Sequence, residues 1–277
     1  DAADPYCYYN RRLIELQKKF VYDIWNHINP YTGLAYKDDP VFVLTEIVNE
    51  RDFFSRGKLQ LEPYVSEFRR LFADWCAREG VEYDTAGCDV NENSGPLVRC
   101  KIEIQENYYR EMYRALRDAG VRIPIAGTNW RPHAAVIKSN LVNDFTDGHT
   151  YFYDWRWGVE EKFCAHRAVT TVPGFGLQGL AGARILDRPF FVSEWDMPWP
   201  NDFRAESPLL YAAIGALQGW AGWTIHTYAY GTRLSEMRIL GKEASSSSIG
   251  GVPYREGIFS VWNDPAKFGL FYHAALI

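Results

Sequence analysis

The sequence lacks the features by which nucleic-acid-binding and membrane-spanning proteins are recognised. Its formal net charge is −5 over 277 residues, and it contains no run of lysine and arginine. A protein that binds phosphate backbones needs such a run or a basic face. No apolar stretch approaches the roughly 20 residues with which a helix crosses a bilayer. We therefore expect neither a nucleic acid nor a membrane among its partners.

Cysteine is scarce, and its spacing does not match that of a zinc site. The five cysteines are an odd number and include no C-x-x-C pair, which the usual metal-binding patterns contain. Cys88 and Cys100 flank a polar loop, so an oxidising compartment would allow them to pair. Buried free thiols fit the same spacing equally well. The cysteines are Cys7, Cys76, Cys88, Cys100 and Cys164.

Aromatic residues, in contrast, are abundant at 16% of the chain. Many tryptophans stand beside glycine, proline or aspartate in predicted loops. One interpretation places them at the rim of a large core. The other makes them flat platforms for sugar rings, whose apolar C–H faces pack on aromatic side chains. These residues are Trp130, Trp155, Trp157, Trp195, Trp199 and Trp262.

The periodicity of apolar residues predicts alternating strands and helices. Strands rich in Val, Ile and Phe are separated by amphipathic helices, and no hairpin pattern occurs between them. This alternation is typical of a parallel sheet with crossover helices. The predicted strands are 42–48, 121–126, 145–152, 190–194 and 221–228. The predicted helices are 10–28, 62–79, 100–119, 132–140, 207–218 and one from about 264, with loops at 84–98, 154–187 and 230–262.

Polar and aromatic residues follow the ends of successive strands, which favours a (β/α)8 barrel over a doubly wound sheet. A closed barrel of this kind has eight strands, and we predict about five. The chain begins with a helix that no strand precedes, so we expect strands 4 to 8 here and the first three upstream of residue 1. Residues 1–277 then form one catalytic domain that is incomplete at its N-terminus.

Two glutamates stand at the ends of predicted strands and carry the main functional hypothesis. Glu50 follows Asn49 after a long apolar strand, and Glu194 precedes Trp195 after another. Cleavage of a glycosidic bond with retention needs two carboxyl groups about 5–5.5 Å apart. One of them protonates the leaving oxygen, and the other attacks the anomeric carbon. Two strand ends that face each other across a barrel mouth can supply such a pair.

These residues resemble clan A of the glycoside hydrolases, the retaining cellulase-like barrels that include family 5. The match rests on Asn49-Glu50, Glu194, His149-Thr150-Tyr151 and Gly222-Trp223, in the clan's order and each at a strand end. It covers about residues 10–277. Asn29-Pro30-Tyr31-Thr32-Gly33 and Asp39-Pro40 also resemble a group of bacterial cellulase-like proteins whose substrate is poorly defined.

The resemblance implies a role for each matching residue. Glu50 is the general acid/base and Glu194 the nucleophile, with Tyr151 hydrogen-bonded to the nucleophile. His149 lines the site, and Trp223 lies under the sugar that is cleaved. The chain has one departure: the arginine that the clan carries on an early strand, near the nucleophile, is missing, which puts activity in doubt if the whole polypeptide lacks it.

Other polar residues near the strand ends are candidates of lower rank. Asn49 is suited to a hydrogen bond with a sugar 2-hydroxyl, and Glu46 is interpreted as structural, paired with a buried cation. Asp196 is the main rival of Glu194 for the role of nucleophile. Asn129, Trp130, Trp195 and His226 complete the predicted substrate-binding set.

The preferred hypothesis is a retaining enzyme that acts on β-linked oligo- or polysaccharides outside the cytoplasm, extracellular or periplasmic. It needs no metal and no organic cofactor. An exo-acting β-glycosidase on small glycosides is an alternative within the same class. A barrel that binds carbohydrate without catalysis is a second alternative. The third is a metal-dependent hydrolase with His149, His226 and a carboxylate as ligands, although no His-x-His pair ends a strand.

Overall fold

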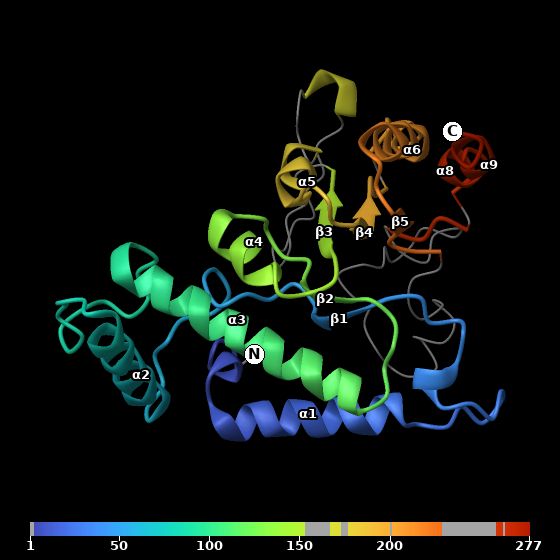
Figure 1. The fold of residues 1–277 in the computed structure, drawn as a ribbon. Coiled ribbons are helices and arrows are strands. Elements are labelled where there is room, and N and C mark those ends of the chain that lie inside the picture. The colour runs from blue at the N-terminus through green and yellow to red at the C-terminus, as the bar shows by residue number, and fades with distance from the viewer. Residues whose placement is uncertain (1–2, 153–166, 173–176, 200, 229–258, 263) are drawn as a thin grey trace, which may run out of the picture. The chain divides into compact units, whose positions relative to one another are not determined.

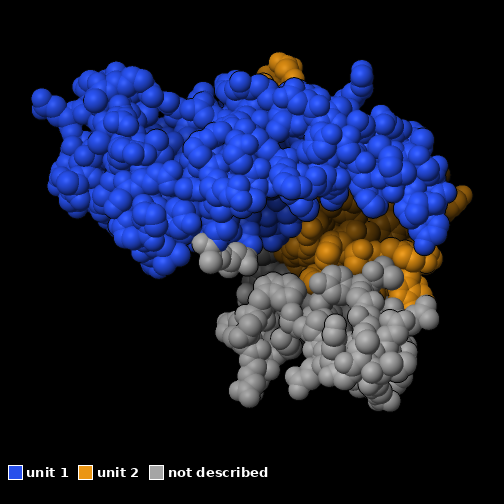
Figure 2. All heavy atoms as spheres, turned by 90° about the horizontal axis from the view of Figure 1, so that it is seen from below, with its two compact units in different colours: residues 1–147 blue, residues 148–277 orange. Residues whose placement is uncertain are grey.

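A computed structural model gives the structure of residues 3–152, 167–172, 177–199, 201–228, 259–262 and 264–277. The chain divides into two compact units, residues 1–147 and 148–277 (Figure 2). Trp155, Trp157 and Cys164 lie outside the described residues, as does most of the predicted loop 230–262. Among the described residues, no helix is long and apolar enough to cross a membrane.

Unit 1 is a helical layer beside a small sheet. In Figure 1 the long helices α1 and α3 run side by side, and α2 packs near the start of α3. Aromatic residues from η1, α2 and α3 fill the core, including Tyr8, Phe68 and Tyr109. Its elements are η1 (Tyr6–Tyr8), α1 (Arg11–Trp25), η2 (Tyr36–Asp38), β1 (Thr45–Val48), α2 (Tyr64–Glu79), α3 (Gly95–Asp118), β2 (Ile125–Thr128) and α4 (Ala134–Asn140).

Local signals explain where these helices begin and end. The side chain of Asn10 caps α1 by accepting a hydrogen bond from the Leu13 N–H at 3.1 Å. Gly80 ends α2 in the left-handed conformation, which costs glycine little. Helix α3 begins at Gly95, five residues before the predicted start at 100, with a proline in its first turn.

Strands β1 and β2 are parallel neighbours, with Glu46 opposite Ala126 and Val48 opposite Thr128. Both differ from the predicted ranges 42–48 and 121–126. β1 begins only at Thr45, and Val43 before it is 69% exposed. β2 extends two residues further than expected, to Thr128. Among the described residues β1 pairs with β2 alone. A second neighbouring strand, which a strand buried on both faces would have, is not found there for the apolar residues 41–44.

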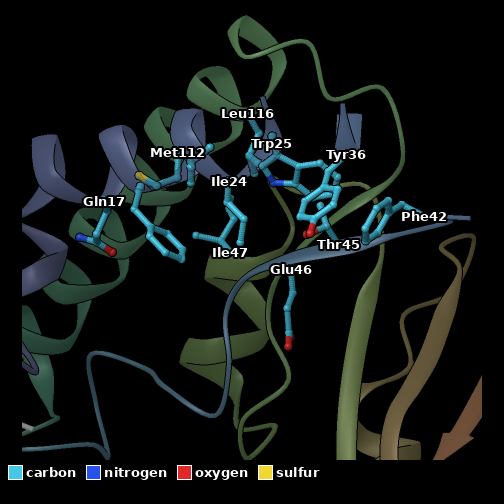
Figure 3. A pocket seen from close by; sticks show the side chains of 12 residues that line it. Gln17, Ile24, Trp25, Tyr36, Phe42, Thr45, Glu46, Ile47, Met112 and Leu116 are labelled. Carbon is cyan, nitrogen blue, oxygen red and sulfur yellow. The ribbon is translucent and has the colours of Figure 1, made fainter. Parts of the chain in front are cut away.

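An apolar cavity of about 470 Å³ lies between α1, α3 and β1 (Figure 3). Phe20 and Ile24 of α1 line it, and Phe20 remains 65% exposed. The carboxylate of Glu46 points away from the cavity, as alternation along a strand requires. Its lining includes Phe20, Val21, Ile24, Trp25, Tyr36, Phe42, Ile47, Met112 and Leu116.

Unit 2 contains a three-stranded sheet in the order β3-β4-β5, in which β4 and β5 are parallel. Helix α6 packs against α8 and α9. Strand β3 begins just before the unit boundary and carries His149 and Tyr151. The elements are β3 (Thr146–Tyr151), η3 (Val169–Thr171), α5 (Leu177–Ala183), β4 (Phe190–Asp196), α6 (Glu206–Gln218), β5 (Gly222–Ile225), α8 (Pro265–Phe268) and α9 (Phe271–Ala274).

The four described cysteines, Cys7, Cys76, Cys88 and Cys100, are free thiols, so no disulfide joins Cys88 to Cys100 in this structure. Burial raises the pKa of Cys100 to about 12. A thiol with such a pKa stays protonated at neutral pH and is a weak nucleophile. It therefore acts as a core residue, alongside Cys76.

Candidate active site

The strand end of β1 carries the first candidate carboxylate. Glu50 lies two residues after β1, half-buried, and its backbone φ is +48°, in the left-handed region. Non-glycine residues seldom occupy that region, and they are concentrated at functional sites. We call Glu46, Asn49, Glu50, Arg56, Asn129 and Trp130 the Glu50 cluster.

Asn129, which follows β2 directly, is bonded to three members of this cluster. Its side-chain oxygen accepts the Glu50 N–H at 2.8 Å. Its amide nitrogen donates to the Glu46 carboxylate at 2.6 Å and to the Asn49 oxygen at 2.9 Å. Asn129 is only 2% exposed, and both of its amide hydrogens are used. Burial and these bonds leave its amide no free donor, so they do not support the prediction that Asn129 contacts substrate.

The same hydrogen bonds determine which atoms of Glu46 and Asn49 are already occupied. Glu46 was expected to be structural and paired with a buried cation, and its carboxylate accepts a hydrogen bond from the amide of Asn129. The oxygen of Asn49 is occupied by Asn129, so its NH₂ group is the part that it can offer to a ligand. Asn49 is exposed, which agrees with that use.

The loop after Glu50 is held by a buried aspartate. Asp52 is fully buried and accepts hydrogen bonds from the N–H groups of Phe54 and Ser55. Ser55 in turn accepts the indole N–H of Trp130 at 3.0 Å. These contacts fix the loop against Trp130, which is half-buried and keeps the position at the strand end that the sequence predicts.

Arg56 is a member of the Glu50 cluster that sequence reasoning missed. Its guanidinium lies 4.0 Å from the centroid of the Trp130 ring and 3.7 Å from the Glu50 carboxylate. Its Nε also donates to the Glu50 carbonyl oxygen at 3.2 Å. The only sequence signal is its place in a polar loop after a strand end, which is too common to select one arginine.

The second candidate carboxylate, Glu194, lies in a β-bulge within β4. Val192 pairs with Trp223 and Trp195 with Ile225, so three steps on β4 face two steps on β5. A bulge of this kind re-aims side chains and occurs often beside active sites. Val192 and Trp195 consequently pack in the same apolar cluster, although simple alternation would place them on opposite faces. Ser193 and Glu194 occupy the bulge between them.

Strand β3 supplies the partners of Glu194. The Tyr151 hydroxyl donates a short hydrogen bond to the Glu194 carboxylate. The Nδ1 atom of His149 is 3.5 Å from the same carboxylate oxygen, and its Nε2 atom is 2.9 Å from the hydroxyl oxygen of Ser193. With Nδ1 protonated, His149 would face Glu194 as a donor while Ser193 donates to Nε2. Ser193 is a second residue that sequence reasoning missed.

His226, at the end of β5, lies beside Tyr151. The two rings meet edge to face with centroids 6.0 Å apart, and His226 also packs on Phe259 at 5.1 Å. We call His149, Tyr151, Ser193, Glu194 and His226 the Glu194 cluster. Four of these five residues follow from the sequence, and the strand order of the sheet brings them together.

Trp195, which was predicted to touch substrate, lies in the core of unit 2, and Trp223, predicted likewise, is partly buried against the same apolar cluster. Trp195 is 1% exposed and stacks on Tyr211 of α6, with ring centroids 4.5 Å apart. The ring of Trp223 packs so closely on Gly215 of α6 that a Cβ there would lie 2.7 Å from it. The bulge explains the burial of Trp195, because it reverses the side of β4 from which Trp195 projects.

Asp196 is excluded as a rival nucleophile by its surroundings. It is fully buried and paired with Lys267 of α8, whose Nζ lies 2.7 Å from Oδ1. The same carboxylate accepts the Met197 N–H at 2.8 Å. Burial raises the pKa of Asp196 to about 6, with Lys267 acting in the opposite direction. Asp196 therefore links β4 to α8 and has no access to a ligand.

The fold of this chain is similar to that of solved mannanase and mannosidase structures. The endo-β-1,4-mannanase of Thermotoga petrophila matches 98% of the chain at 14% identity, with a TM-score of 0.53. A second structure of the mannanase from strain RKU-1, with maltose and glycerol, matches at 15% identity and the same TM-score. The family 5 mannosidase of Rhizomucor miehei matches at 13% identity and a TM-score of 0.53.

The chain spans 51%, 67% and 60% of these three structures, respectively, which fits a partial barrel. A variant of the Rhizomucor mannosidase, of which the chain spans 59%, has been solved in complex with mannosyl-fructose. No protein-family model and no curated protein matches the sequence. At this identity the likeness concerns the fold alone, which is that of a mixed α/β chain.

Proposed function

We propose that this chain carries the catalytic half of a retaining glycoside hydrolase, with Glu50 as general acid/base and Glu194 as nucleophile. The observation that supports it most is the hydrogen bond from Tyr151 to Glu194 in the β4 bulge. A hydroxyl donor beside a strand-end carboxylate orients one oxygen and leaves the other for attack. The fold of family 5 mannanases and mannosidases supports the same reaction class.

The proposed reaction is a double displacement. Glu50 gives its proton to the glycosidic oxygen while Glu194 bonds to the anomeric carbon, and the leaving group departs as an alcohol. Glu50, now ionised, takes a proton from water, which attacks the glycosyl-enzyme and releases Glu194. No metal takes part in either step.

Replacing each carboxyl by an amide of the same shape tests both roles. Glu50→Gln and Glu194→Gln should each lower kcat by more than about 10³-fold on an unactivated β-glycoside, because each removes an obligatory group. Glu103→Gln, at a half-buried position on α3 where the carboxylate pairs with Arg78, is the matched control and should keep full activity. Unchanged hydrolysis in either active-site variant contradicts the assignment.

Azide distinguishes the nucleophile from the acid/base. Glu194→Gly should regain turnover with azide and an aryl glycoside, and should give a glycosyl azide of inverted configuration. Glu50→Gly should give the azide product of retained configuration, because the covalent intermediate still forms. The anomeric configuration can be measured by NMR. The opposite pairing of product and variant would exchange the two roles.

We propose a β-linked oligo- or polysaccharide as substrate, with mannans first in the panel. The support is the fold shared with endo-acting mannanases and with a mannosidase. Product profiles on β-mannan, β-glucan and β-galactan, with the matching aryl glycosides, separate endo from exo action. Treatment with EDTA should leave the rate of hydrolysis unchanged. A loss of activity on that treatment would favour a metal-dependent hydrolase.

A further inference from the structure

Asn129 occupies an unusual position for a strand-end amide, because it binds the backbone of Glu50 instead of facing a ligand. Its side chain is 2% exposed and makes hydrogen bonds to Glu46, Asn49 and the Glu50 N–H. The orientation of the amide is determined by its partners. The Glu50 N–H can only donate and the Glu46 carboxylate can only accept, so the oxygen must face Glu50.

This contact lies where the backbone is least favourable. Glu50 has a φ of +48°, and a non-glycine residue in that region needs support from its surroundings. The Asn129 oxygen captures the Glu50 N–H at 2.8 Å, in the conformation that directs the N–H toward β2. Glu46, four residues earlier on the strand side, holds the other end of the amide at 2.6 Å.

We propose that Asn129, anchored by Glu46, is the positioning residue that fixes Glu50 for proton transfer. This inference rests on the proposed function of Glu50 as general acid/base. Asn129 does not touch substrate. It acts through the backbone of Glu50, and the loss of its oxygen lets the carboxyl move away from the leaving oxygen. A displacement of about 1 Å can cost 100-fold in rate.

The leaving group makes this role measurable. A phenyl glycoside needs a proton from Glu50 as its bond breaks, whereas a 2,4-dinitrophenyl glycoside leaves without one. Replacing a residue that positions the acid should therefore lower the rate on the phenyl glycoside and leave the rate on the dinitrophenyl glycoside unchanged. Damage to the fold or to sugar binding would lower both rates by the same factor.

The experiment compares kcat/KM for these two glycosides, prepared from the sugar that the panel identifies. Asn129→Ala should lose about 10- to 100-fold on the phenyl glycoside and less than about threefold on the dinitrophenyl glycoside. Asn140→Ala is the matched control. Asn140 is buried beside β2 and bonds the backbone of Thr128 without contacting Glu50, so its variant should leave the ratio of the two rates unchanged.

A pair of reciprocal substitutions tests the anchor. Asn129→Asp keeps the oxygen that accepts the Glu50 N–H but places a second carboxylate beside that of Glu46. The two negative charges repel each other, so this variant should lower the rate on the phenyl glycoside. Adding Glu46→Gln to that variant supplies an amide donor in place of the carboxylate. The double variant should recover most of the lost phenyl rate, with dinitrophenyl rates nearly constant throughout.

The outcomes separate this inference from the proposed function. If the wild-type chain hydrolyses the dinitrophenyl glycoside with Glu194 required, and Asn129→Ala lowers both rates equally, the positioning role is refuted while the function stands. If Glu50→Gln itself changes neither rate, the acid/base assignment fails and the positioning role fails with it. A double variant that recovers nothing refutes the anchoring role of Glu46.

Discussion

At the scale of single residues, the buried ion pair between Lys267 and Asp196 is expected to affect the free energy of unfolding strongly. Both side chains are fully buried, and the pair joins α8 to the end of β4, two residues after Glu194. Removing one member of a buried pair leaves the other charge without compensation, which costs about 3–5 kcal/mol. Exposed pairs contribute much less.

We expect Lys267→Met to lower the free energy of unfolding by about 3–5 kcal/mol, measured by denaturant titration. Lys19→Met is the matched control, because Lys19 pairs with Asp23 on the exposed face of α1, and its loss should cost under about 1 kcal/mol. Equal effects of the two variants would show that the buried pair does not stabilise the fold.

At the scale of elements, the sequence predicts which segments are helices and strands better than it predicts how side chains are aimed. Apolar periodicity located α1, α2, α4 and α6 to within a few residues. The β4 bulge could not be predicted, because it depends on pairing with β5 and not on the residues of β4 alone. The burial of Trp195 in the core of unit 2 therefore could not be predicted from β4 alone.

The candidate site follows the same division. Strand ends indicate Glu50, Glu194, His149 and Tyr151, since chemistry-bearing residues there are rare enough to notice. The roles of Asn129 and Arg56 depend on hydrogen bonds across loops, which no local pattern encodes. The sequence therefore predicts the two candidate carboxylates and Tyr151, the hydrogen-bond partner of Glu194, but it indicates neither Arg56 nor the contacts that Asn129 makes.

Helix α3 and the loop before it provide a test that depends on pH. Lys101 is 3% exposed and donates to Asn93 and to the Glu92 carbonyl. Desolvation lowers its pKa from 10.5 to about 8. Between those values the unfolded chain binds more protons, so the contribution of Lys101 to stability increases with pH, by about 3 kcal/mol in all.

We expect the stability difference between wild type and Lys101→Met to shift in favour of wild type between pH 7 and pH 10. Denaturant titrations at both pH values measure it. Lys138→Met, on the exposed side of α4, should show no such shift. A constant difference for Lys101→Met would mean that its ammonium is solvated as well as in the unfolded chain.

At the scale of the whole molecule, unit 1 exposes apolar surface beside β1, which within the described part of the chain pairs only with β2. The cavity between α1, α3 and β1 is bordered by Phe20 and Ile24, which are 65% and 40% exposed. Contiguous apolar patches and open strand edges promote association between chains. The matched mannanase and mannosidase structures are longer than this chain, which spans about half to two thirds of them.

We expect the 277-residue chain to self-associate at micromolar concentration and Phe20→Lys to weaken that association at least fivefold, as measured by sedimentation velocity. Leu217→Lys, at an exposed position on α6, is the control and should have little effect. Equal behaviour of wild type and both variants would show that this face does not mediate contact.

The left-handed backbone at Glu50 has an evolutionary consequence. Glycine adopts that conformation without steric cost, so Glu50→Gly should be more stable than Glu50→Gln by up to about 1 kcal/mol, although both lose the reactive group. A lineage released from selection for hydrolysis would gain robustness by drifting to Asn-Gly at this strand end. That dipeptide would mark descendants that retain the scaffold after abandoning the chemistry.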